Sequence, residues 1–322
     1  MSSNLPLVLK EKLQDQGYHI IGRRGAFKAC QWQKKSLLYD EECYKHKFYG
    51  IESHRCLQMT PVVDKCTHSC EFCWRITPSD IGIHWNQTEI SPDEADSVEQ
   101  LLDGVIGANI KSLGGYNPEV NSNVSKAKYN QARDPKHVAI SLAGEPTLYP
   151  LLNDFIEEIG NRKMTSFLVT NGTKPDVIEN LSMPTQLYVT LPAPDHETYK
   201  RLCRPLESKG WENLNRTLEI LPSLSGRRVI RLTMVAGLNM HNPRDYSSLI
   251  DKSEVDFIEV KGYMHIGSSR KRLNRVHAPS HREVVAFAEK ISHLTGYNLD
   301  DEQKTSRVVL LSRKKNTNKI VL

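Results

Sequence analysis

The chain has 322 residues, of which 39% are hydrophobic, and its 43 basic and 38 acidic side chains give a formal net charge of +5. This length accommodates one large α/β domain or two smaller ones. The chain has no run of about 18 consecutive apolar residues, which argues against a membrane-spanning helix, and its first residues lack the basic-then-apolar order of a signal peptide. We therefore expect a cytoplasmic protein without a membrane partner, in which thiols stay reduced.

The predicted elements begin after a polar N-terminal extension, residues 1–53, that carries two cysteines. From residue 54 onward, apolar β-branched runs alternate with helical patterns. The predicted strands are 54–63, 137–144, 166–172, 186–193, 228–237 and 256–264. Helices are predicted near 93–113, 151–162, 174–181, 195–202, 211–221, 243–252 and 281–294. The Gly/Asn/Lys-rich segment 114–136 reads as a long loop, and the tail 306–322 as an added strand or hairpin.

The alternation of strands and helices predicts an α/β fold with a parallel sheet, because buried parallel strands show continuous apolar runs. Six such units make a partial (β/α)6 barrel, two short of the eight units of a closed barrel. We expect two parts, a cysteine-bearing extension over 1–53 and a core domain over 54–322 that ends in a small C-terminal strand addition. Functional side chains in such folds gather at the carboxyl ends of the strands.

Three cysteines with the spacing C-x3-C-x2-C follow the first predicted strand: Cys66, Cys70 and Cys73. Three thiolates can hold three irons of a cubane [4Fe-4S] cluster and leave the fourth iron open to another ligand. A zinc knuckle needs a fourth ligand at zinc-finger spacing, which the sequence lacks. His68 inside the loop and His84 downstream read as ordinary loop histidines.

With Phe72 before its last cysteine, this loop resembles the signature of the radical S-adenosylmethionine superfamily. The resemblance implies that the open iron binds the amino and carboxylate groups of S-adenosylmethionine and that an electron from the cluster releases a 5′-deoxyadenosyl radical. It also implies cofactor contacts by Gly144 and Glu145 in "LAGEP", Asn171 in "TNG" and Thr190 in "VTLPAP", each of which ends a predicted strand. Each motif alone is weak, and their succession at consecutive strand ends is stronger.

A second triad of cysteines lies upstream with the spacing C-x12-C-x12-C: Cys30, Cys43 and Cys56. Six of the seven cysteines thus fall within 44 residues, and the remaining one is Cys203. Buried structural thiols are the simpler interpretation, since cysteine packs as a small hydrophobic residue. We favour a second [4Fe-4S] cluster with its own open iron, because chance burial does not explain this clustering.

The stretches "YGIESHRCLQMTP", "CTHSCEFCWR", "SLAGEPTLYP", "VTNGT" and "GYMHIGSSRKRL" together resemble the tRNA 4-demethylwyosine synthase family of archaeal and eukaryotic wybutosine biosynthesis, over about residues 25–300. The resemblance implies a radical enzyme that condenses N1-methylguanosine, 3′ of the anticodon in tRNA-Phe, with pyruvate. Eukaryotic members carry a flavodoxin-like reductase domain, and this sequence shows no flavin-binding segment. The chain therefore resembles the shorter archaeal form, which receives electrons from an external donor of flavodoxin or ferredoxin type. We also expect a monomer.

The resemblance leaves two sites open for pyruvate. An open iron of the second cluster can chelate an α-keto acid, whereas Lys45, two residues after Cys43, can form an imine or an ion pair with it. Without the resemblance, Lys45 reads as a solvated lysine in the charged run "DEECYKHK". We favour chelation, with Lys45 as a candidate catalytic residue.

For RNA binding, "HIGSSRKRLNR" places four cations after the sixth predicted strand: Arg270, Lys271, Arg272 and Arg275. Such a run attracts phosphates, as does the positive net charge, although most such runs are only solvated surface. Arg75, Trp74 and Trp85 follow the cysteine loop, where an aromatic ring can stack on a splayed base or simply belong to the core.

Two other functions stay open at this point. A radical enzyme of the same superfamily that acts on a peptide or small metabolite shares the cysteine loop, but the basic run argues mildly against it. A non-catalytic iron–sulfur or zinc protein that binds RNA predicts no glycine–glutamate motif at a strand end, yet "AGEP" is present.

Overall fold

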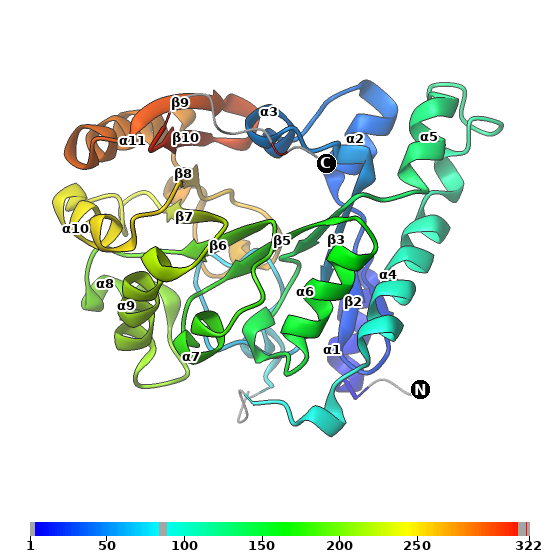
Figure 1. Cartoon of the computed structure of the whole chain (residues 1–322), viewed down its shortest axis with the longest axis horizontal. Helices are drawn as coiled ribbons and strands as arrows, with labels where there is room; N and C mark the ends of the chain where they lie inside the picture. Colours follow the sequence, from blue (N-terminus) through cyan, green and yellow to red (C-terminus); the bar gives the residue numbers. More distant parts are fainter. Residues whose placement is uncertain (1–3, 84–88, 315–319, 321–322) are drawn as a thin grey trace. The chain divides into compact units, whose positions relative to one another are not determined.

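The computed structural model describes residues 4–83, 89–314 and 320, and divides into two compact units. The first unit comprises Met1–Lys65, Trp85–Leu168 and Lys319–Leu322, and the second comprises Cys66–His84 and Val169–Asn318. Figure 1 colours both by sequence. The units interleave along the chain, so the boundary expected at residue 54 divides sequence segments rather than compact units and stays a prediction.

In the first unit the strand order is β1-β2-β3-β4-β5. The strands are β1 (His19–Ile21), β2 (Gly25–Phe27), β3 (Cys56–Thr60), β4 (His137–Ile140) and β5 (Thr165–Thr170), the last of which runs two residues into the second unit. The β1–β2 hairpin joins β3 in antiparallel fashion, and β3, β4 and β5 are parallel. All four residues of β4 are buried, as expected for a parallel strand.

The helices of the first unit are α1 (Leu7–Asp15), α2 (Gln31–Tyr39), α3 (Tyr44–Tyr49), α4 (Val98–Ser112), α5 (Lys126–Ala132) and α6 (Leu152–Asn161). Helix α6 buries Leu152, Phe155, Ile156 and Ile159, the i, i+3, i+4, i+7 stripe that predicted it. The N-terminal extension supplies three of the helices and the edge hairpin, which the sequence interpretation did not resolve.

The segment 114–136 is not the long loop that we predicted. It contains a 3₁₀ turn, Gly114–Tyr116, and helix α5, whose first turn is capped by the side chain of Ser125. A small apolar cluster of Leu37, Leu113, Val124 and Ala132 packs there. The apolar residues of segment 114–136 are too sparse to show a helical period. The cluster is completed by Leu37, which comes from helix α2.

In the second unit the strand order is β6-β7-β8-β10-β9. The strands are β6 (Gln186–Thr190), β7 (Arg227–Met234), β8 (Phe257–Gly262), β9 (Asn298–Gln303) and β10 (Val308–Ser312). Strands β6, β7 and β8 are parallel, and β10, which lies in the tail 306–322 predicted as a strand or hairpin, joins β8 in antiparallel fashion. Its hairpin partner β9 begins at Asn298, upstream of the predicted tail. The helices are α7 (Pro175–Glu179), α8 (His196–Cys203), α9 (Gly210–Ile220), α10 (Pro243–Ser253) and α11 (His281–Thr295).

All six predicted strands and all seven predicted helices are present. The alternation of parallel strands with helices confirms the α/β class and the β/α units of a partial (β/α)6 barrel. Within the described residues, no helix combines the length and the apolar character needed to cross a bilayer.

Candidate functional site

The cysteine loop, residues 66–75, belongs to the second unit, where main-chain hydrogen bonds hold it to the end of α8. The N–H of Ser69 donates to the carbonyls of Cys203 (3.1 Å) and Arg204 (3.2 Å), and the N–H of Glu71 donates to Leu202 (2.9 Å). These carbonyls lie at the C-terminus of the helix, where they lack intrahelical partners. These hydrogen bonds satisfy the carbonyls at the end of α8 and also fix the backbone of the cysteine loop.

Asn171, just after β5, binds the other end of the loop. Its Nδ2 donates to Thr67 Oγ1 at 2.8 Å and lies 3.8 Å from Cys66 Sγ, while its Oδ1 accepts from the N–H of Thr173 at 3.1 Å. The amide thus orients the segment that carries the first cysteine. A direct cofactor contact of Asn171, and of the half-buried Thr190 at the end of β6, stays a prediction.

The donor atoms of this loop suit an iron–sulfur cluster. Cys66, Cys70 and Cys73 are each partly exposed and offer three sulfurs within a loop of ten residues. The ring of Phe72, between the last two, packs against the buried cluster of Leu202, Val235, Tyr263 and Leu273. This packing fixes the backbone between the thiols, and a sulfur donor set is the one that iron–sulfur clusters use.

The structure also brings two residues to Cys70 that the sequence interpretation set aside. Ligand atoms of His68, Cys70 and Cys203 all lie within 4.8 Å of one another. His68 Nε2 is hydrogen-bonded to the hydroxyl of Tyr199 at 2.6 Å, and burial lowers the pKa of His68 to about 4, so the imidazole is neutral at pH 7. Cys203 is fully buried on α8. No local spacing in the sequence indicates this proximity, because 132 residues separate Cys70 from Cys203.

Arg272 holds the last cysteine of the loop from the other side. Its guanidinium donates to the carbonyl of Cys73 and to that of Glu71, and forms an ion pair with Asp80. The side chains of Arg272 and Asp80 are only 8% and 5% exposed. The donors of Arg272 are therefore used within the protein, which favours a structural role over the RNA contact that we predicted.

The backbone before Arg272 also packs on the loop. The N–H of Ser268 donates to the carbonyl of Trp74 at 2.8 Å. Gly267 has a φ of +58°, and a Cβ there would lie 2.1 Å from the same carbonyl, so only glycine fits. The guanidinium of Arg75 lies over the Trp74 ring at 4.9 Å, and Trp85 lies outside the described residues.

In the first unit, the glycine–glutamate motif follows β4. Gly144 has a φ of +70°, and a Cβ there would lie 1.8 Å from the carbonyl of Val62. The N–H of Glu145 donates to the carbonyl of Lys65 at 2.8 Å, and its buried carboxylate accepts from the hydroxyl of Thr147 at 2.8 Å. The motif thus holds a carboxylate at the carboxyl end of the strand, against the segment that leads into the cysteine loop.

The second triad also comes together in the first unit, although twelve residues separate its members. Cys30 precedes α2, Cys43 precedes α3 and Cys56 begins β3. Burial raises the pKa of Cys56 to about 12, the ammonium of Lys45 opposes this rise, and the charges of Cys43 and Cys30 add to it. These four side chains are therefore within electrostatic reach of one another.

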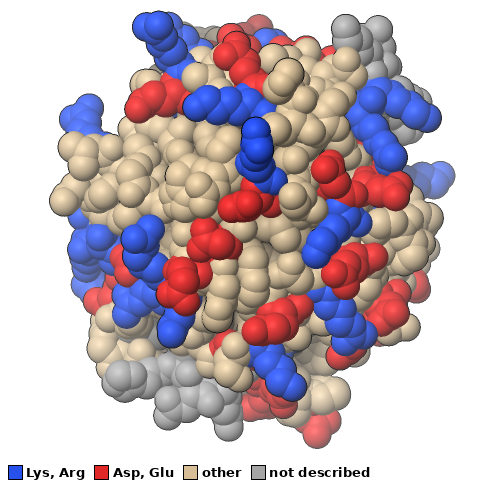
Figure 2. Space-filling view, turned by 90° about the vertical axis from the view of Figure 1, so that its left-hand side faces the viewer, with Lys and Arg blue, Asp and Glu red and all other residues tan. Residues whose placement is uncertain are grey.

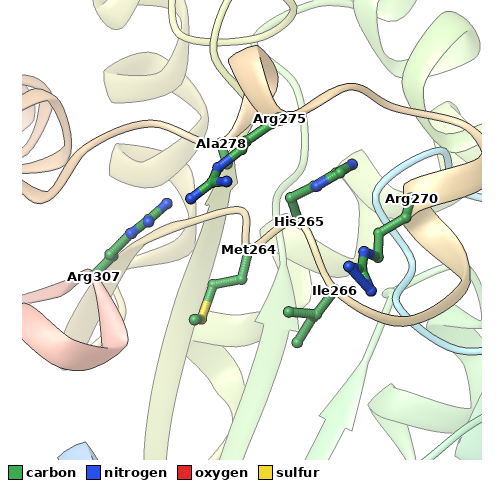
Figure 3. Close-up of a pocket in the computed structure, with 7 residues that line it drawn as sticks. All are labelled: Met264, His265, Ile266, Arg270, Arg275, Ala278 and Arg307. Carbon is green, nitrogen blue, oxygen red and sulfur yellow. The ribbon is translucent and has the colours of Figure 1, made fainter.

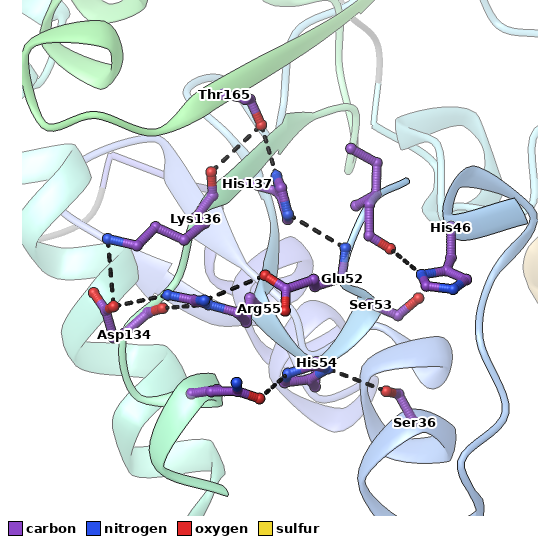
Figure 4. Close-up of polar contacts among 12 residues, drawn as sticks. Ser36, His46, Glu52, Ser53, His54, Arg55, Asp134, Lys136, His137 and Thr165 are labelled. Atoms are coloured by element: carbon purple, nitrogen blue, oxygen red, sulfur yellow. Dashed lines mark hydrogen bonds and ion pairs between the residues drawn. The ribbon is translucent and has the colours of Figure 1, made fainter. Parts of the chain in front are cut away.

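Polar contacts fix the segment between Cys43 and Cys56 (Figure 4). The N–H of Glu52 donates to His137 Nε2 at 3.3 Å, so His137 Nδ1 carries the proton and donates to Thr165 Oγ1 at 2.7 Å. Burial lowers the pKa of His137 to about 4, which keeps this neutral form at pH 7. Arg55 binds Glu52 at 3.2 Å and Asp134 at 2.8 Å.

Lys45 points inward from α3. Its Nζ lies 4.6 Å from the ring centroid of Phe167, a fully buried residue of β5, and the side chain is half-buried. His46 and Lys47, the next residues on the same helix, are exposed. Lys45 is therefore not the solvated lysine that the charged run suggests.

The triad and the glycine–glutamate motif occupy opposite ends of the same strands. Cys56 pairs with His137 at the amino ends of β3 and β4, whereas Glu145 follows the carboxyl end of β4. At about 3.3 Å per residue, the four residues of β4 span roughly 13 Å. Lys45 reaches the middle of this strand layer, at Phe167.

Three of the four cations in the predicted RNA-binding run are exposed: Arg270, Lys271 and Arg275. They follow β8 in the second unit, and Arg270 and Arg275 line a cavity (Figure 3). Arg272, in the same run, faces the cysteine loop instead.

Comparisons with known proteins agree with this geometry. Residues 60–250 match the radical SAM superfamily model, and residues 252–313 match the model for wyosine base formation. The S-adenosyl-L-methionine-dependent tRNA 4-demethylwyosine synthase of Pyrococcus abyssi is 46% identical over 315 residues, which cover 96% of this chain and 90% of the relative.

Two solved structures are similar over nearly the whole chain. A structure of TYW1 with a lysine–pyruvate adduct bound is 36% identical, with a TM-score of 0.87, and the match covers 98% of this chain and 99% of that one. A crystal structure of archaeal TYW1 is 34% identical, with a TM-score of 0.80, and the match covers 98% of this chain and all of that one.

We predict that Glu145→Gln weakens the binding of S-adenosylmethionine, because the cofactor's ammonium loses a charged partner. Such a hydrogen bond contributes about 1.5–3 kcal/mol, which corresponds to a rise in Kd of roughly 10- to 150-fold. Equilibrium dialysis with the reconstituted protein measures the Kd. Iron content stays unchanged, because Glu145 is not a ligand, and Glu99→Gln, an exposed glutamate on α4, serves as the control. Equal affinity in both variants contradicts the role.

We also predict that Cys203→Ala keeps the full iron content of the reconstituted protein, whereas Cys70→Ala lowers it. The loop already supplies the three sulfurs that an open cluster needs, so the buried Cys203 thiol is a neighbour and not a ligand. Iron and sulfide analysis after anaerobic reconstitution measures the difference. If Cys203→Ala removes as much iron as Cys70→Ala, Cys203 is a fourth sulfur ligand of the cluster.

Proposed function

Because the chain belongs to the family of S-adenosyl-L-methionine-dependent tRNA 4-demethylwyosine synthases, we propose that it converts N1-methylguanosine, 3′ of the anticodon in tRNA-Phe, to 4-demethylwyosine with pyruvate as carbon donor. The inward-facing Lys45 beside the second cysteine triad is the observation that supports this function most directly. The radical SAM superfamily includes enzymes with other substrates, but the match of residues 252–313 to wyosine base formation favours the tRNA reaction over a peptide or metabolite.

The cysteine loop and the glycine–glutamate motif prepare the radical step. Cys66, Cys70 and Cys73 would hold a [4Fe-4S] cluster, and S-adenosylmethionine bound with it would supply the radical chemistry that acts on the N-methyl group. Glu145 accepts hydrogen bonds from the cofactor's ammonium, and the contacts of Asn171 and Arg272 keep the loop in place. Electrons come from an external donor of flavodoxin or ferredoxin type, in a cytoplasmic, monomeric enzyme.

Cys30, Cys43 and Cys56 hold a second [4Fe-4S] cluster. Three elements, α2, α3 and β3, place these partly exposed thiols within electrostatic reach of one another. The nearby Lys45 offsets part of the negative charge that deprotonated thiols bring. The hydrogen bond from the N–H of Cys43 to Ser53 Oγ, at 3.0 Å, fixes the middle ligand.

Lys45 carries pyruvate as an imine. Its Nζ attacks the keto carbon, the C=N bond forms and the keto oxygen leaves as water, while the carboxylate stays on the substrate. The sequence favoured chelation by the second cluster, but the lysine–pyruvate adduct in the solved TYW1 structure supports the imine. The contact with Phe167 directs the amine into the strand layer, away from the charged helix surface.

If each triad holds its own cluster, each triple substitution should remove a defined share of the bound iron. Replacing Cys66, Cys70 and Cys73 with Ala should remove half of the bound iron, and replacing Cys30, Cys43 and Cys56 should remove the other half, because each triad holds its own cluster. Reconstitution followed by iron analysis measures this, with circular dichroism as a check on folding. Full iron retention in the second variant would leave the protein with a single cluster.

For Lys45, we expect borohydride to trap labelled pyruvate on this residue, as a tryptic peptide of increased mass. In a complete reaction with N1-methylated tRNA-Phe, Lys45→Ala and Lys45→Arg should both lose product while cleaving S-adenosylmethionine normally, because neither offers a nucleophilic amine. Lys47→Ala and Lys47→Arg, on the exposed side of the same helix, should keep the parent's activity. Substantial product from Lys45→Arg favours chelation, in which a fixed charge suffices.

A further inference from the structure

A cationic cavity of about 400 Å³ lies in the second unit, within the segment that matches wyosine base formation (Figure 3). Seven residues line it: Met264, His265, Ile266, Arg270, Arg275, Ala278 and Arg307. Most of them follow β8, and Arg307 directly precedes β10. The C-terminal hairpin thus contributes one of the three arginines, which the basic run in the sequence does not include.

The arginines of this cavity differ from others in the same unit. Arg228, Arg231 and Arg313 are each paired with a carboxylate. In contrast, none of the cavity-lining residues is acidic, and within the described part of the chain Arg270 and Arg275 form no side-chain hydrogen bond or ion pair. Uncompensated guanidinium groups around one cavity repel each other, so an anion stabilises this arrangement.

The side chains divide the cavity into two chemical regions. In Figure 3, Arg275 and Arg307 extend toward one another, and Arg307 is fixed by a hydrogen bond to the carbonyl of Pro279 at 2.9 Å. Together they form a fork suited to one phosphate. Met264 and Ile266 provide an apolar region, and Ile266 is 44% exposed, so its side chain is accessible to a ligand.

His265 adds a hydrogen-bonding group that suits RNA. Its Nε2 lies 2.9 Å from the carbonyl of Leu273, which can only accept, so Nε2 carries a proton. In the neutral ring, Nδ1 is therefore an acceptor. A ribose 2′-hydroxyl is a donor of the kind that this nitrogen can bind, and DNA lacks it.

We propose that this cavity binds one nucleotide from the single-stranded anticodon loop of the substrate tRNA. The phosphate lies between Arg275 and Arg307, the ribose faces His265 and the base packs against Ile266 and Met264. This assignment rests on the proposed function for its RNA substrate, and it adds Arg307 and His265 to the residues that the basic run predicted.

The test measures the binding of an anticodon stem-loop RNA by fluorescence anisotropy at several salt concentrations. Arg275→Gln alone should raise Kd about tenfold, and the double variant with Arg307→Gln should lower the log–log salt slope by about 0.7, the value for one single-strand phosphate. Arg275 has no partner among the described residues, so its substitution carries little folding risk.

Arg244→Gln is the matched control, because it removes the same charge from an exposed position on α10. Helix α10 lies on the side of Figure 1 that faces the viewer in Figure 2, where basic and acidic side chains are interspersed. This variant should bind RNA with the parent's Kd and salt slope. A parent-like Kd and slope for Arg275→Gln and the double variant overturn the proposal.

Further measurements distinguish the binding of RNA from the binding of another anion, and a failure of the cavity assignment from a failure of the proposed function. If inorganic phosphate binds the parent and not the double variant while RNA binds both equally, the cavity takes a free anion and the proposal fails. An all-DNA stem-loop should bind more weakly than RNA to the parent, and His265→Ala should reduce this difference. Reductive cleavage of S-adenosylmethionine without RNA should be unchanged in the Arg244→Gln control. A parent that binds the stem-loop through Arg275 but forms no 4-demethylwyosine refutes the proposed function and not the cavity.

Discussion

The contacts of one buried guanidinium, that of Arg272, determine how the cysteine loop is supported. A charge buried to this extent is stable only when its donors are satisfied, and Asp80 and the carbonyls of Glu71 and Cys73 satisfy them. Removing one partner of such a buried pair typically costs about 3–5 kcal/mol. The loop that carries three thiols is therefore tied to the C-terminal, wyosine-forming part of the chain by an interaction that is costly to break.

The parallel strands of the first unit also fix the distance between the second cysteine triad and the glycine–glutamate motif. The second triad lies at their amino ends and the glycine–glutamate motif at their carboxyl ends, so the length of β4 sets the spacing between the two. A lysine anchored on α3 reaches into this interval because its long side chain extends from the amino end to Phe167. If Lys45 carries the substrate as proposed, the substrate would lie on the side of the triad that faces the carboxyl ends of the strands, where enzymes of this architecture place their chemistry.

The six strands and seven helices predicted from residue 54 onward could be read from the sequence, because these strands are apolar runs and these helices show a helical period. The helices α1 to α3 and the β1–β2 hairpin of the N-terminal extension could not. Helix α5 could not, since its burial depends on Leu37 from α2. Likewise, the spacing of Cys66, Cys70 and Cys73 indicates their loop directly, whereas the approach of Cys203 and His68 to Cys70 depends on the packing of α8. The sequence also shows a lysine at position 45 but not the direction in which α3 points it.

The basic run illustrates the same limit and explains the placement of the cavity. Arg270, Arg272 and Arg275 are equivalent in the sequence, but the turn that begins at Gly267, whose φ only glycine tolerates well, directs Arg272 inward and leaves its neighbours outside. Arg275 lies three positions after Arg272, and an extended chain spans at most about 11 Å over three positions. If Arg275 binds a phosphate as proposed, the same short segment carries that RNA contact and Arg272, whose guanidinium holds the carbonyl of Cys73 and so supports the cysteine loop.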